Sequence, residues 1–149
     1  MISIENILEK YWGYSSFRKP QKEIINTVLE GNDTIALLPT GGGKSICFQV
    51  SALAKEGVCI VISPLIALIE DQVSQLKNKG IKALSLTSGL SRNELETQLN
   101  NAEFGNYKFL YLSPERLQQE LVQNRIQHMN VNFIALYCLN TPNYTTIAL

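Results

Sequence analysis

The stretch "LLPTGGGKS" at residues 37–45 decides the fold that the rest of the chain is expected to adopt. Three consecutive glycines follow an apolar run and lead into a helical pattern. Successive glycines let the backbone turn its N–H groups inward around an anion, and the positive end of the following helix adds to the attraction. In this pattern Lys44 reaches the β- and γ-phosphates of a nucleotide, and the Ser45 hydroxyl binds Mg²⁺. The strict pattern has glycine where this chain has Leu38, but the remainder predicts a phosphate-binding loop.

Short apolar runs that alternate with helical patterns surround this loop. The runs lie at residues 34–38, 58–62, 82–86, 108–112 and 133–136. Most are too continuous for strands with one face in water, so we expect them to be buried on both faces. Buried strands that alternate with helices predict an α/β fold with a parallel, doubly wound sheet.

Helix signals fill the segments between these runs. Apolar residues recur at helical spacing over residues 3–12, and Pro20 suits the first position of a second helix. One apolar face runs from Leu65 to the helix end before Gly80. Ser91 and Glu94 form a capping box, which predicts a further helix start at that point.

The composition is that of an ordinary soluble domain. The chain has 149 residues, is 45% hydrophobic and has no apolar run near the ~20 residues that a membrane span requires. Three dispersed cysteines argue against a disulfide framework, and a single histidine, His128, argues against a zinc site. We therefore expect one cytoplasmic domain with reduced core cysteines and no membrane partner.

The formal net charge is zero, with 13 basic and 13 acidic residues. General electrostatic attraction to nucleic acid is therefore not part of the composition. Any binding of phosphate groups must come from local geometry, above all from main-chain N–H groups at helix starts.

Two further strand ends have such geometry. "ISPLIAL" (62–68) and "LSPERL" (112–117) each place serine as an N-cap and proline in the first helical turn after an apolar run. Each alone is explained by a well-formed helix start. Together with the glycine loop they would place three helix N-termini at one edge of the sheet. A nucleic-acid backbone could then be held there by main-chain amides and by Arg116.

A third group of candidates precedes the loop, in "GYSSFRKPQ" (13–21). The ring of Tyr14 can stack on a base, and the amide of Gln21 can donate to and accept from an adenine edge. From spacing alone, a surface turn before a helix explains this segment better than a binding site does.

The segments "GYSSFRKPQ", "PTGGGKS", "SPLIALIEDQV" and "YLSPERL" occur in this order. Together they make the chain similar to the N-terminal half of RecQ-type DNA helicases, in helicase superfamily two. The resemblance covers roughly residues 5–136 and implies a RecA-like P-loop NTPase domain over residues 1–136. It also implies ATP binding against a second RecA-like domain, which this chain lacks, and hydrolysis coupled to 3′-to-5′ movement on single-stranded or partly duplex DNA.

The resemblance also implies roles for individual residues. Adenine recognition would involve Tyr14, Arg18 and Gln21. Phosphate binding, with Lys44 as the catalytic lysine and Ser45 as the Mg²⁺ ligand, would involve Thr40, Gly41, Gly42, Gly43, Lys44 and Ser45. The segments that approach DNA would supply Pro64, Leu65, Ser113, Pro114, Glu115 and Arg116.

The match departs from the family at one point. In RecQ-like helicases the strand that corresponds to "FIAL" (133–136) leads directly into Asp-Glu-Ala-His, whereas this chain has Tyr137 and Cys138. A phenol and a thiol cannot replace the acid that binds the metal shell and the acid that positions water. Residues 137–149 form an uncharged tail unlike the family, and the last carboxylate in the chain is that of Glu120.

Three interpretations follow. The leading one is the N-terminal part of a helicase, interrupted at residue 137 by a frameshift or truncation, which binds nucleotide weakly at most and does not hydrolyse it. The second is a non-catalytic nucleotide- or DNA-binding module. A small P-loop kinase is disfavoured, because it leaves residues 63–73 and 111–117 unexplained and equally needs a metal-binding acid.

Overall fold

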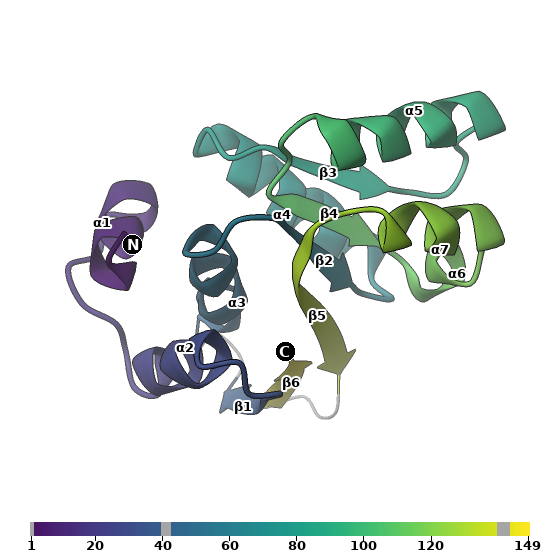
Figure 1. Cartoon of the computed structure of the whole chain (residues 1–149). Helices are drawn as coiled ribbons and strands as arrows, with labels where there is room; N and C mark the ends of the chain where they lie inside the picture. Colours follow the sequence, from purple (N-terminus) through teal and green to yellow (C-terminus); the bar gives the residue numbers. More distant parts are fainter. Residues whose placement is uncertain (1, 40–42, 140–143) are drawn as a thin grey trace. The chain divides into compact units, whose positions relative to one another are not determined.

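The computed structural model describes residues 2–39, 43–139 and 144–149. The chain divides into two compact units, both drawn in Figure 1. The first comprises Met1–Glu56 and Ala135–Leu149, and the second comprises Gly57–Ile134. The strand at Val131–Leu139 begins in the second unit and ends in the first.

Three helices belong to the first unit: α1 (Ile4–Trp12), α2 (Gln21–Leu29) and α3 (Lys44–Leu53). Their buried apolar side chains form one cluster made of Ile7, Leu8, Ile25, Ile46 and Val50. The helix predicted over residues 3–12 is confirmed. Pro20 is the residue before α2 rather than its first helical residue, a shift of one position that is common at helix ends.

The strands of the first unit are β1 (Ile35–Pro39), the second part of β5 (Val131–Leu139) and β6 (Tyr144–Ala148). β6 pairs antiparallel with both β1 and β5. The uncharged tail therefore adds an antiparallel strand that the sequence analysis did not predict. Only residues 140–143 separate β5 from β6, whereas a parallel pairing needs a crossover of a dozen or more residues.

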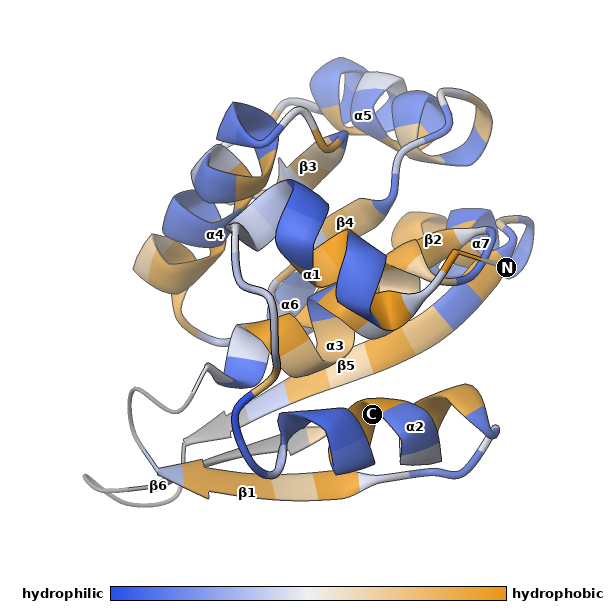
Figure 2. Cartoon of the chain, turned by 90° about the vertical axis from the view of Figure 1, so that its left-hand side faces the viewer, coloured by the Kyte–Doolittle hydropathy of each residue, from blue (hydrophilic) through white to orange (hydrophobic). Residues whose placement is uncertain are grey.

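β1 has one buried and one exposed face. Ala36 and Leu38 are buried, whereas Ile35 and Leu37 are 77% and 61% exposed. Figure 2 shows the apolar colouring of β1 and β5 along much of their length. The prediction of burial on both faces is wrong for β1, because an apolar run does not reveal which of its side chains lack a packing layer.

The second unit contains the parallel part of the sheet. β2 (Val58–Ile62) and β3 (Ala83–Leu86) both pair in parallel with β4 (Phe109–Leu112). Every residue of β2 and β4 is buried, as the continuous apolar runs predicted. The α/β class with a parallel sheet is thus confirmed.

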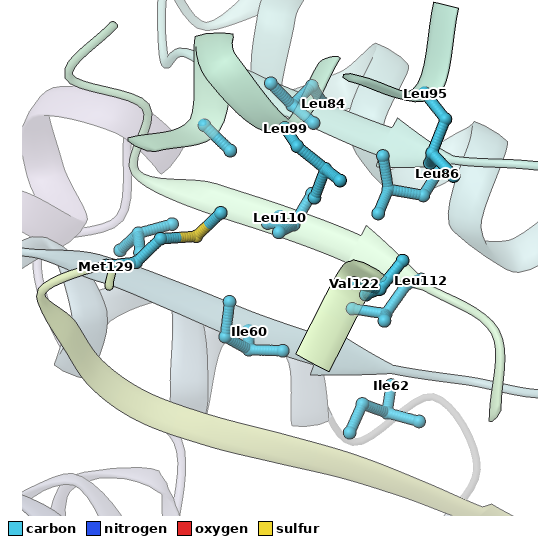
Figure 3. Close-up of a cluster of buried hydrophobic side chains, with 12 residues drawn as sticks. Ile60, Ile62, Leu84, Leu86, Leu95, Leu99, Leu110, Leu112, Val122 and Met129 are labelled. Carbon is cyan, nitrogen blue, oxygen red and sulfur yellow. The ribbon is translucent and has the colours of Figure 1, made fainter. Parts of the chain in front are cut away.

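Helices cover both faces of this parallel sheet. They are α4 (Ile66–Asn78), α5 (Arg92–Phe104), α6 (Pro114–Leu117) and α7 (Glu120–Gln127). Leu110 and Leu112 of β4 pack with residues of α5 and α7, as Figure 3 shows. Tyr111, between them, points to the other face, where its hydroxyl donates to Gln72 Oε1 of α4 at 2.8 Å.

Two sequence expectations at the level of single residues are also met in the described structure. Ser91 and Glu94 form the capping box at the start of α5, with both reciprocal hydrogen bonds present. Cys47 and Cys59 are free and buried.

Candidate functional site

A pocket of about 320 Å³ lies in the first unit, beside the start of α3. Its lining comes from the segment before α2, from the first residue of α2 and from the residues around the start of α3. The residues that line it are Tyr14, Ser16, Arg18, Gln21, Gly43 and Ile46. The structure therefore brings the three residues predicted for adenine together with the last glycine of the phosphate-binding loop.

Gln21 connects these two parts of the pocket. Its side chain is 3% exposed, and its Oε1 accepts a hydrogen bond from the Arg18 backbone N–H at 2.9 Å. Its Nε2 donates to the Gly43 carbonyl oxygen at 3.1 Å. One partner is a donor and the other an acceptor, so the two bonds define the orientation of the amide.

Gly43 is required at its position by this contact. It has a φ of 71°, in the left-handed region, and a Cβ atom there would lie 2.3 Å from Gln21 Nε2. Any side chain at residue 43 would therefore displace Gln21 and strain the backbone. The phosphate loop and the predicted base-binding segment are joined by direct contact.

Lys44 and Ser45 are the first two residues of α3, and both are half-buried. Backbone N–H groups in the first turn of a helix have no partner within the helix and attract anions. Thr40, Gly41 and Gly42 lie outside the described residues. The described residues fit ATP, because a pocket lined by an aromatic ring and a side-chain amide adjoins a helix start that carries a lysine. For Mg²⁺ they supply one hydroxyl, that of Ser45, whereas Mg²⁺ at nucleotide sites is usually held by one or two carboxylates together with phosphate oxygens and water.

Sequence reasoning missed two residues of this pocket, Ser16 and Ile46. Ser16 lies inside the segment already singled out, so only the choice of residues within it was incomplete. Ile46 belongs to the buried cluster of the first unit and supplies an apolar wall. Helical periodicity places it on the inner face of α3 but does not indicate a pocket.

Tyr137 stands where the family resemblance implies an aspartate. It is 5% exposed, and its ring meets that of Phe48 edge-on, with centroids 5.7 Å apart and planes at 89°. It is thus a core residue packed against α3. The side chain of Cys138 lies outside the description. In the described part of the chain, no three His, Cys, Asp or Glu side chains are grouped so that they could hold a metal ion.

A second pocket, of about 500 Å³, lies within the second unit. Four of the six residues predicted to approach DNA line it: Pro64, Ser113, Glu115 and Arg116. Leu65 is 42% exposed and Pro114 is the first residue of α6, but neither lines this pocket. The loop after β3, residues 87–89, lines the pocket as well and was not among the predicted residues.

The two helix starts at this pocket differ. Ser113 caps α6 as predicted, since its Oγ accepts from the Arg116 backbone N–H at 3.3 Å. Ser63 is not the N-cap of α4, so that prediction is wrong. α4 begins at Ile66 after Leu65, and the Ser63 hydroxyl accepts from the Leu65 N–H at 3.2 Å. Ser63 closes a local turn before the helix, as serine hydroxyls commonly do.

The side chain of Arg116 is directed into the protein. It is a residue only 9% exposed, and its Nε and Nη2 donate to the Thr87 carbonyl oxygen at 3.2 and 2.6 Å. Its Nη1 donates to Gln119 Oε1 at 3.1 Å. The guanidinium group thus donates to groups of the protein, whereas the sequence analysis predicted a direct contact between Arg116 and a phosphate group.

The family model described as DEAD/DEAH box helicase matches residues 18–136, most of the chain. The chain belongs to the DEAD/DEAH box helicase family. The match includes Arg18, Gln21 and all of the phosphate-binding loop, and it ends at the residue before Tyr137.

Curated relatives of this helicase-family chain carry RecQ-type names, which confirms the resemblance seen in the sequence. The chain is 42% identical over 137 residues to the probable ATP-dependent DNA helicase RecS of Bacillus subtilis (strain 168), covering 91% of this chain and 27% of the relative. It is 47% identical over 129 residues to the ATP-dependent DNA helicase RecQ of Synechocystis, covering 87% and 27%. The chain therefore spans about a quarter of the length of these relatives.

None of the helices in the described ranges is both long enough and apolar enough to cross a bilayer.

Proposed function

We propose that this chain is an ATP- and DNA-binding part of a RecQ-type ATP-dependent DNA helicase. The observation that carries the proposal is the contact between Gln21 and Gly43 in one pocket. It joins a segment suited to a purine base to a loop suited to phosphates, which is the arrangement that a nucleoside triphosphate requires. The whole helicase would add a second RecA-like domain across the nucleotide.

The predicted site residues of the first unit then each have a role in ATP binding. Tyr14 stacks on adenine, Gln21 pairs with its edge, and Arg18 borders the same pocket. Residues 40–45 surround the phosphates, with Lys44 as the catalytic lysine that neutralises developing charge on the γ-phosphate. Ser45 is one ligand of the Mg²⁺ that accompanies ATP.

The second unit supplies the contacts to DNA. Its pocket is lined by Ser113 at a helix start, by Arg116 and Glu115, and by Pro64 before α4. Main-chain and hydroxyl groups contact the sugar-phosphate backbone without reading the base sequence. Such contacts suit single-stranded or partly duplex DNA, and they need no positive net charge.

For the chain by itself, we propose binding without hydrolysis. Residue 137 is a buried tyrosine that packs on Phe48, and no carboxylate follows Glu120. The acid that would complete the Mg²⁺ shell and the one that would position water are therefore missing. A non-catalytic nucleotide-binding module is the second candidate function that this observation favours.

Two titrations test the proposal, after a thermal melt has shown that the purified chain is folded. Calorimetry with Mg²⁺ and a non-hydrolysable ATP analogue should show saturable binding at one site. Fluorescence anisotropy with a labelled single-stranded oligonucleotide should show binding that weakens as salt is added. A folded chain that binds neither ligand would overturn the proposal.

A further inference from the structure

We propose that Arg116 is a positioning residue, which holds the loop Thr87–Gly89 in place as one wall of a nucleic-acid groove. This groove is the pocket of about 500 Å³ in the second unit, where the DNA backbone would bind. This inference rests on the proposed DNA binding and specifies how the groove in the second unit is built. It assigns the phosphate contacts to the loop rather than to the guanidinium group of Arg116.

The hydrogen bonds of Arg116 support this assignment. Two of its nitrogens donate to the same acceptor, the carbonyl oxygen of Thr87, which is the first residue after β3. A third nitrogen donates to Gln119, just beyond the four-residue helix α6. Arg116 therefore links the loop after β3 to the segment after β4. A buried guanidinium group that is bonded in this way is costly to redirect toward a ligand.

The loop itself has the chemistry of a backbone-binding wall. Thr87, Ser88 and Gly89 all line the 500 Å³ pocket, and Ser88 and Gly89 are exposed. They offer a hydroxyl group and main-chain groups, which contact phosphate and sugar oxygens regardless of base. Glu115 lines the same pocket, and its carboxylate repels phosphate, so the neutral loop is the favourable side for the backbone.

The loop contains one residue in a conformation that favours glycine. Gly89 has a φ of 87°, in the left-handed region, and a Cβ atom there would meet no heavy atom within 4 Å. The positive φ of Gly89 and the Thr87 carbonyl bonded by Arg116 are two features that favour this loop conformation. Loss of either should move Ser88 without removing any group of the loop from the pocket.

The first experiment measures the affinity of the full chain for a labelled single-stranded oligonucleotide in three variants. Arg116→Gln and Arg116→Lys should each weaken binding by about tenfold or more, since neither side chain reproduces the pair of hydrogen bonds to the Thr87 carbonyl oxygen. Arg125→Gln is the matched control. Arg125 is another partly buried arginine of the second unit, paired with Glu103 at 2.9 Å, and its replacement should leave affinity unchanged.

The salt dependence of binding separates positioning from direct contact. A lost phosphate contact lowers the slope of log affinity against log salt concentration by about 0.7 for single strands. We expect the slope of both Arg116 variants to equal that of the unaltered chain. Nucleotide affinity, measured in parallel, should also stay the same.

A second pair of variants tests the loop without touching Arg116. Gly89→Ala forces a side chain into the left-handed region, which should shift the loop and weaken DNA binding. Gly80→Ala is the control, because Gly80 has a φ of 78°, equally open surroundings and a place outside the pocket.

Several results would overturn the inference. One is unchanged DNA affinity in Arg116→Lys, and another is a salt-dependence slope reduced by about 0.7 in Arg116→Gln. A third is a loss of DNA affinity in Arg125→Gln as large as in the Arg116 variants, or in Gly80→Ala as large as in Gly89→Ala. Absence of DNA binding by the unaltered chain would overturn the DNA-binding proposal and this role together. Equal binding by the unaltered chain and both Arg116 variants would overturn this role alone.

Discussion

At the scale of single residues, Gln21 and Arg116 are held in a similar way. Each is buried, and each donates to a backbone carbonyl of a loop that lines a pocket, Gly43 for Gln21 and Thr87 for Arg116. Such a side chain favours one conformation of the loop, because any other conformation would leave a buried polar group without its hydrogen bond, at a cost of about 1–3 kcal/mol.

The first prediction concerns nucleotide choice at Gln21. We expect Gln21→Ala to weaken binding of the ATP analogue and to narrow the preference for adenine over guanine nucleotides, because the amide edge that pairs with adenine is gone. A calorimetric competition titration between ATP and GTP analogues, in the presence of Mg²⁺, measures this preference. Gln75→Ala, an exposed glutamine on α4 bonded to Asp71, is the control. An undiminished preference for adenine in Gln21→Ala would contradict the assigned role.

At the scale of elements, strands with similar apolar sequences differ in how far their side chains are buried. β2 and β4 are buried along their whole length, whereas β1 alternates between exposed and buried residues. All three are short apolar runs in the sequence. They differ because β2 and β4 have packing layers on both faces, while the face of β1 that carries Ile35 and Leu37 has none in the described structure.

The second prediction compares the two adjacent leucines of β1. Leu38→Ala should lower the free energy of unfolding by about 2–5 kcal/mol, because it leaves a cavity in the core. Leu37→Ala should change it by no more than about 0.5 kcal/mol, as expected for an exposed position. Urea denaturation of both variants measures the difference. Equal losses at the two positions would show that the outer face of β1 is covered.

The third prediction concerns the capping box of α5. The Ser91 backbone N–H donates to the Glu94 carboxylate at 2.7 Å, and this bond lowers the carboxyl pKa of Glu94 below its ordinary value of 4.5. A carboxyl whose pKa is lower in the folded state stabilises the fold above the unfolded-state pKa, and this contribution is lost as the pH falls through the folded-state pKa.

Glu94→Gln should therefore remove part of the loss of stability on acidification, since glutamine keeps a cap acceptor but does not titrate. Urea midpoints between pH 7 and pH 3 measure this effect. Glu96→Gln, the same change in the same helix at a residue paired with Arg92, is the control. If both variants follow the unaltered chain at every pH, the capping bond does not contribute to the pH dependence.

At the scale of the whole molecule, the proposed function gives this chain a role in binding and none in hydrolysis. Each described unit contains a pocket with residues suited to phosphate-bearing ligands. The net charge is zero, so both interactions must depend on local geometry rather than on general attraction.

The fourth prediction is that the purified chain does not release phosphate from ATP, with or without single-stranded DNA. Two positioned carboxylates are absent at residues 137 and 138, and groups of this kind contribute rate factors of about 10² or more each. A phosphate-release assay tests this, with Lys44→Ala to identify contaminating activity. DNA-stimulated release that Lys44→Ala abolishes would contradict the prediction.

The sequence by itself determined the α/β class and the family, and it predicted a phosphate-binding loop and the order of strands and helices up to β5, apart from α7. These are local signals, written in hydrophobic periodicity, glycine spacing and caps, so they can be read without knowing which segments meet. The segment that contains Tyr14, Arg18 and Gln21 was also visible, but spacing alone did not distinguish a binding site from a surface turn.

The tertiary structure alone decided which residues come together. It brought Gln21 to Gly43, turned Arg116 inward to Thr87, placed Ser63 in a turn before α4 and reversed β6 between β1 and β5. Such outcomes depend on contacts between segments far apart in the chain and on which faces are covered. No local pattern records them, because the same apolar run or the same arginine suits several environments until packing selects one.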